Sequence, residues 1–130
     1  MTEQTSNTEN IFTELTNKSL GGIEVGKILD YPKEFPTELI ENLALITALK
    51  YWNGEINYTD GDCIMNNLFA FWVTNNYYVD NYSFSDIAWE CYEAFDAGEY
   101  YRTNDDRNID PAEKYTKPLI EELLKKRNTI

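Results

Sequence analysis

The side chains of this chain that could do chemistry are carboxylates and aromatic rings, and most of the rings gather with many of the carboxylates in one segment. Residues 51–101 contain nine acidic residues, fifteen of the nineteen aromatic residues, and no lysine or arginine. This segment carries a charge of −9, compared with −4 for residues 1–50 and +1 for residues 102–130. The net charge of −12 is therefore concentrated in the middle of the chain.

Three of these carboxylates have the spacing of one helix face. Asp86, Glu90 and Glu93 fall at i, i+4 and i+7, which aligns them along one stripe of a helix. The apolar residues of the same segment fall on the opposite side, at about 150° from the acids. These residues are Phe84, Ile87, Ala88, Cys91 and Phe95. No lysine lies nearby in the sequence, so we expect carboxylates that face solvent and repel one another.

The residue types argue against catalysis. The chain has no histidine, which removes the usual general base and the commonest metal ligand. Cys63 and Cys91 do not form a C-x-x-C pair and are expected to be buried free thiols. A calcium loop beginning at Asp106 would need glycine and glutamate where Pro111 and Lys117 stand. We therefore predict no enzymatic activity, no metal and no cofactor; the alternative, a carboxylate pair in glycosidic chemistry, would require a cleft.

Length and composition indicate one folded domain covering residues 1–130. A hydrophobic content of 42% with many aromatic residues is too high for a disordered acidic chain. The polar residues 1–9 are expected to form a flexible N-terminus. They lack the features of a secretory signal, and no apolar run reaches the roughly 18 to 20 residues that span a bilayer. These observations predict a cytoplasmic protein with no membrane contact.

Apolar periodicity predicts an all-α fold, a compact bundle of four to five helices. A short helix is expected over residues 9–20, and a clearer one follows Pro36. Asp62 is expected to cap the next helix after a loop containing Asp60 and Gly61. Ser83 or Ser85 would cap the helix that ends near residue 97.

Two segments are less clear. Residues 22–30 fit either a short strand or a helix, because Ile23 and Val25 alternate whereas Val25 and Ile28 share a helical face. At the C-terminus Asp110 begins a predicted helix, and Pro118 predicts a kink just before it. The basic cluster 125–127 that ends this helix is interpreted as compensation for the helix dipole.

The acidic and aromatic segment predicts a surface that binds another protein. Carboxylates one helical turn apart, roughly 5 to 6 Å, approximate the spacing of about 7 Å between nucleic-acid phosphates. Interspersed aromatic residues would supply the anchors that dominate interface energies. The predicted partner-binding residues are Asp86, Trp89, Glu90, Glu93, Asp96, Glu99, Tyr100 and Tyr101.

Our hypothesis is a small acidic binding module that neutralises a basic partner, such as a nuclease or nucleic-acid-binding protein. The analogy is with bacterial immunity proteins and phage counter-defence inhibitors, and it rests on charge, size and composition alone. The net charge disfavours direct contact with nucleic acid. The alternative is a structural module in which exposed aromatic residues mediate self-association, as in a homodimer, and the charge maintains solubility only.

Overall fold

The computed structural model describes residues 9–16 and 18–130 of the chain. The described residues form helices and no strand, so the predicted all-α fold is confirmed. Residue 9 already belongs to a helix that covers residues 9–14, while the rest of the predicted flexible terminus lies outside the described residues.

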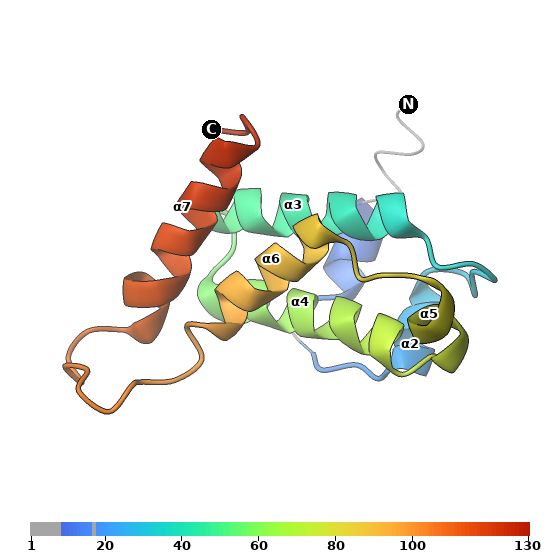
Figure 1. Cartoon of the computed structure of the whole chain (residues 1–130), viewed down its shortest axis with the longest axis horizontal. Coiled ribbons are helices and arrows are strands. Elements are labelled where there is room, and N and C mark those ends of the chain that lie inside the picture. Colours follow the sequence, from blue (N-terminus) through green and yellow to red (C-terminus); the bar gives the residue numbers. More distant parts are fainter. Residues whose placement is uncertain (1–8, 17) are drawn as a thin grey trace.

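Two long antiparallel neighbours, α3 (Thr37–Trp52) and α4 (Tyr58–Val73), run along the long axis of the molecule, and α6 (Asp86–Asp96) packs across both (Figure 1). Helix α7 (Lys117–Lys126) lies at one end of the molecule, and α2 (Gly22–Ile28) and α5 (Asn76–Asn81) lie at the other (Figure 1). One hydrophobic core joins these elements. Its fully buried side chains include Leu15, Ile40, Leu68, Phe95 and Leu124.

The ambiguous segment is the helix α2, so the strand alternative is wrong. A strand would place Ile23 and Val25 on the same face. In the helix Val25 is fully buried while Ile23 is 88% exposed. The Glu24 carboxylate accepts a hydrogen bond from the Gly21 amide at 2.7 Å, which fixes the start of the helix.

Helix α4 begins earlier than the sequence predicted. Its cap is Asn57, whose side-chain oxygen accepts from the Asp60 amide at 2.8 Å. Asp62 is therefore not a cap but lies within the helix. Gly61 serves packing instead of a turn, because a Cβ atom there would lie 2.4 Å from the Phe95 ring. This glycine lets α4 approach α6 closely.

The helix α5 was not predicted from the sequence, because three asparagines and one aspartate in this segment indicated a loop. Asn75 caps this short helix by accepting from the Tyr78 amide at 3.1 Å. The buried Tyr78 ring then packs against Phe35 and Phe71. Tertiary packing of one aromatic side chain thus outweighs the weak helix propensity of the segment.

The C-terminal helical segment contains the irregularity that Pro118 predicted. A π-helical turn, η1 (Ala112–Thr116), directly precedes α7. Proline has no amide hydrogen to donate to the preceding turn, so the regular α-helical hydrogen-bond pattern cannot continue there. The Thr116 hydroxyl instead ties this turn to α6 by donating to the Ala94 carbonyl at 2.7 Å.

None of the described helices combines the length and the apolar character needed to cross a membrane.

Candidate protein-interaction surface

Helix α6 presents its acidic residues outward because its apolar residues enter the core. Of the two predicted candidates, Ser83 and Ser85, it is Ser85 that caps the helix, its hydroxyl oxygen accepting from the Ala88 amide at 3.3 Å. Ala88, Cys91 and Phe95 are buried on the side that faces α3 and α4. This arrangement divides the outer surface into a central ridge and two flanks.

The central ridge carries Asp86 and Glu93, both exposed. Neither carboxylate forms an ion pair with any other residue that the structure describes. Asp86 lies in the first turn of α6, where a negative charge is favourable to the helix. Glu93 lies beyond the first turn and has no such role.

Glu90 departs from the prediction of an unpaired acidic stripe. Its carboxylate accepts from Lys126 at 2.9 Å and from Arg127 at 2.5 Å. These cations lie 36 and 37 residues away in the sequence, and the packing of α7 on α6 brings them into contact. The two basic residues therefore neutralise Glu90 in addition to lying at the negative end of the α7 dipole.

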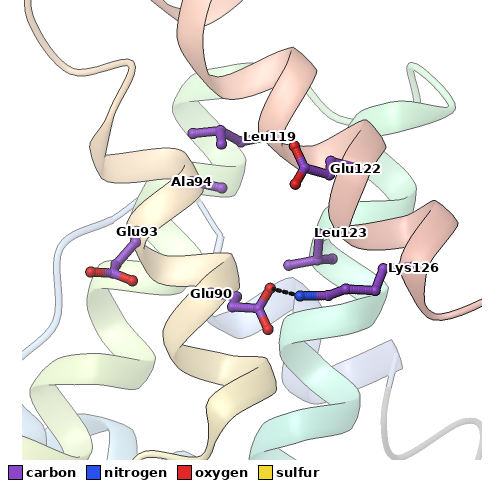
Figure 2. Close-up of a pocket in the computed structure, with 7 residues that line it drawn as sticks. All are labelled: Glu90, Glu93, Ala94, Leu119, Glu122, Leu123 and Lys126. Atoms are coloured by element: carbon purple, nitrogen blue, oxygen red, sulfur yellow. Dashed lines mark hydrogen bonds and ion pairs between the residues drawn. The ribbon is translucent and has the colours of Figure 1, made fainter.

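A groove runs between α6 and α7 on this flank (Figure 2). Its volume is about 170 Å³. Ala94, Leu119 and Leu123 form the apolar part of its lining. Leu119 is 43% exposed, so part of its side chain remains in contact with water. The polar residues of the lining are Glu90, Glu93, Glu122 and Lys126.

The opposite flank, between α6 and α4, holds like charges. Asp62 of α4 faces Asp96 of α6 and Glu99, which follows that helix, and Asn66 donates to the Glu99 carboxylate at 3.5 Å. Partial burial, the hydrogen bond with Glu99 and the charges of Glu99 and Asp96 raise the pKa of Asp62 to about 7. Burial and Glu99 also raise the pKa of Asp96. We call Asp62, Asp96 and Glu99 the carboxyl cluster.

Asp62 was not among the predicted site residues because it was interpreted as a cap. Recognising Asn57 as the cap would have corrected the register of the helix. Asp62 would then have been placed one turn after the cap, on a face next to the buried Gly61. The proximity of Asp96 depends on tertiary packing, for which the sequence has no local signal.

An aromatic row continues from the carboxyl cluster along the α4–α6 flank. Trp89, which is 41% exposed, stacks on Tyr92 with ring centroids 5.6 Å apart and an interplanar angle of 11°. Tyr92 in turn stacks on Phe69 at 4.5 Å. Burial and the charges of the carboxyl cluster raise the pKa of Tyr92. The row holds Trp89 in a fixed orientation beside the acids.

Tyr100 and Tyr101, also predicted to bind the partner, do not join this row. The Arg102 guanidinium lies 4.7 Å from the centroid of the Tyr100 ring, and the Arg107 guanidinium lies 4.7 Å from that of Tyr101. The chain's own cations thus occupy one face of each ring. The structure places Trp89 in the aromatic row on α6 and pairs these two tyrosines with arginines.

The described residues contain no group of three histidine, cysteine, aspartate or glutamate side chains that could hold a metal ion. Burial raises the pKa of Cys91 to about 12, so its thiol stays protonated. Cys63 is only partly buried, contrary to the prediction. The absence of enzymatic activity remains a prediction.

Comparisons of the chain with protein-family models, with curated proteins and with solved structures found no match.

Proposed function

We propose that this protein binds a basic protein partner through α6 and the two flanks of that helix. The observation that carries the proposal is the combination of the unpaired Asp86 and Glu93 with the carboxyl cluster and the exposed, stacked Trp89. Cationic side chains of a partner would relieve the repulsion within the cluster, and Trp89 would give a rigid apolar contact.

The class of partner follows from the charge pattern. A nuclease or another nucleic-acid-binding protein presents clustered cations that normally contact phosphates. The acids of α6 and of the carboxyl cluster would occupy that basic surface and block it, as an immunity protein or a counter-defence inhibitor does. Under this proposal the protein acts in the cytoplasm and needs neither a cofactor nor catalysis.

The test compares two triple variants with the same change in charge. In the first, Asp86, Glu93 and Glu99 are replaced by lysine. In the control, the exposed Glu14, Glu38 and Asp80 are replaced by lysine on other helices. Glu38 lies in the first turn of α3, as Asp86 does in α6, so these two substitutions are matched in their effect on a helix dipole.

Each protein is immobilised on a support and incubated with an extract of the source organism. Proteins that are retained are then released with a salt gradient. We expect a basic protein to be retained by the parent chain and by the control variant but not by the α6 variant. With that protein purified, its association rate at low salt should fall at least about tenfold for the α6 variant, and the salt dependence should flatten. Equal retention by all three proteins would contradict the proposal.

The α2–α5 end of the molecule gives specific support to self-association as a second function. Ile23 is 88% exposed and Tyr31 is 66% exposed, and both border a pocket of about 470 Å³. Such an exposed apolar surface is typical of interfaces. Light scattering over a range of concentrations tests this alternative: a dimer that Ile23→Ser dissociates, and that the α6 variant leaves intact, would favour it.

A further inference from the structure

The groove between α6 and α7 combines an apolar lining with an excess of negative charge. Its lining contains three glutamates and one lysine, and Arg127 beside it also pairs with Glu90, so these five residues carry a charge of −1. In Figure 2 the Glu90–Lys126 ion pair spans one end of the groove, and Glu122 lies nearer the other end on α7. In Figure 2 the Leu119 side chain projects from α7 toward Ala94 of α6 at the end away from Lys126, and Leu123 lies between Leu119 and the ion pair.

This combination matches the two parts of a lysine side chain, which has a flexible four-carbon stem and a compact charge at its tip. A methylene stem would cover Leu119, whose 43% exposure leaves apolar surface in water. An ammonium group would meet Glu122, which forms no ion pair with another described residue.

Lys126 already demonstrates where an ammonium group can bind. Its Nζ atom lies 2.9 Å from Glu90, at one end of the groove. Lys126 also follows Glu122 by four residues on α7, a spacing and order that favour an ion pair on a helix surface. An incoming ammonium group between Glu90 and Glu122 would compete with Lys126 for Glu90, and Glu90 would keep its ion pair with Arg127.

We propose that the α6–α7 groove receives a lysine side chain of the basic partner, with the stem on Leu119 and Leu123 and the ammonium group between Glu90 and Glu122. This inference rests on the proposed function. It adds a specific pocket on α7, outside the carboxyl cluster. Lys126, which carries the same charge as the incoming lysine, occupies the Glu90 end of this pocket when no partner is bound.

The experiment uses the full chain with labelled methyl groups and a capped lysine, Nα-acetyl-lysine N-methylamide, as the probe. Capped norleucine has the stem without the charge, and methylammonium has the charge without the stem. We expect the capped lysine to cause saturable shifts in the methyl signals of Ala94, Leu119 and Leu123, and the other two probes to cause none. Equal shifts with capped norleucine, or shifts confined to the α4–α6 flank, would overturn the proposal.

Three variants at exposed positions sharpen the result. Glu122→Gln should weaken binding of the capped lysine by roughly twofold to fivefold, the range of an exposed ion pair. Leu119→Ala should weaken it by removing apolar contact. Lys126→Gln should strengthen it, because the internal competitor is lost. Amide spectra that match the parent chain show that each variant is folded, and unchanged affinity in all three variants would overturn the proposal.

The proposed function and this inference can fail separately. A basic partner that binds Leu119→Ala and Glu122→Gln normally but does not bind the α6 variant would overturn the lysine site and leave the proposed function standing. A chain that binds capped lysine in the groove but retains no basic protein would overturn the proposed function.

Discussion

Asp105 and Asp62 are two aspartates with opposite electrostatic environments. Asp105, in the loop before η1, accepts hydrogen bonds from Lys114 at 2.8 Å and from the Tyr115 hydroxyl at 2.6 Å, and its second oxygen accepts from the Arg102 amide at 2.7 Å. These bonds hold its pKa well below the ordinary value. Asp62 faces other carboxyl groups, and its pKa is raised to about 7.

The difference shows how the chain uses its few cations. Lysines and arginines of the C-terminal segment neutralise Asp105 and Glu90, and both pairings hold that segment in place. The carboxyl cluster receives less positive charge. Arg102 lowers the pKa of Asp96, but burial and the charge of Glu99 raise this pKa by more. A native structure that leaves carboxylates in mutual repulsion gains most when a partner supplies the positive charge.

The contact between Gly61 and Phe95 brings the carboxyl cluster together, and Gly61→Ala should break it. An added methyl group would lie 2.4 Å from the ring, so α4 and α6 must separate. We expect a loss of about 1 to 3 kcal/mol in the free energy of unfolding, the usual range for overpacking. Asp62 and Asp96 directly follow the two contacting residues, so the pKa of Asp62 should also fall. Urea unfolding and an NMR titration measure the two effects.

Gly26→Ala is the matched control, because it is also a glycine within a helix. Its added methyl group would meet the Phe71 ring at an ordinary distance of 3.7 Å. Alanine there should stabilise the protein by up to about 1 kcal/mol through its better helix propensity. Similar effects of the two substitutions would show that the Gly61 contact does not hold the helices in register.

Asp105→Asn tests the other side of the comparison. The amide cannot replace the charge-assisted bonds from Lys114 and Tyr115, so the melting temperature at pH 7 should fall by several degrees. Because the folded-state pKa of Asp105 is lowered, its stabilisation is present above the ordinary pKa and is lost as the pH falls through the folded-state value. The difference in melting temperature between the variant and the parent chain should therefore be smaller at pH 2 than at pH 7.

Asp106→Asn provides a control in the same loop. Asp106 accepts one bond, from the Asn108 amide at 2.9 Å, and an asparagine oxygen can still accept it. This variant should melt close to the parent chain at both pH values. A loss at Asp106 as large as that at Asp105 would assign the effect to the net charge of the loop and not to the network.

The sequence predicted the faces of α6 well because spacing along one helix determines them. Ser85, the buried Phe95 and the exposed Glu93 all lie where periodicity indicated. Predictions were wrong where the deciding contact comes from a distant segment. Asp60 and Gly61 resembled a turn, but the aromatic ring that needs the glycine belongs to another helix.

The charge pattern was misjudged for the same reason. No lysine or arginine lies near Glu90 in the sequence. The two cations that pair with it, Lys126 and Arg127, come from the end of α7. The carboxyl cluster likewise forms only because α4 and α6 pack in one particular register along their axes. Periodicity assigns residues to faces, and only the tertiary structure determines which faces meet.

Asp62→Asn should have the smallest effect, and its sign distinguishes the cluster from the Asp105 network. Because the folded-state pKa of Asp62 is raised, its contribution favours folding below the ordinary pKa of 3.8 and is lost as the pH rises to about 7. The rise of this pKa to about 7 corresponds to at most about 4 kcal/mol, which solvent screening of this half-exposed group reduces to about 1 kcal/mol.

Asparagine imitates the protonated aspartate, so the variant should match the parent chain at pH 4 and exceed its stability by about 1 kcal/mol at pH 8. Urea unfolding at both pH values measures this difference, and Asp80→Asn removes the same charge from an exposed position on α5 as a control. A variant less stable than the parent chain at pH 8 would mean that Asp62, like Asp105, is stabilised by its neighbours. The carboxyl cluster would then have no unsatisfied charge for a cationic partner to neutralise, and the contrast between the two regions would be lost.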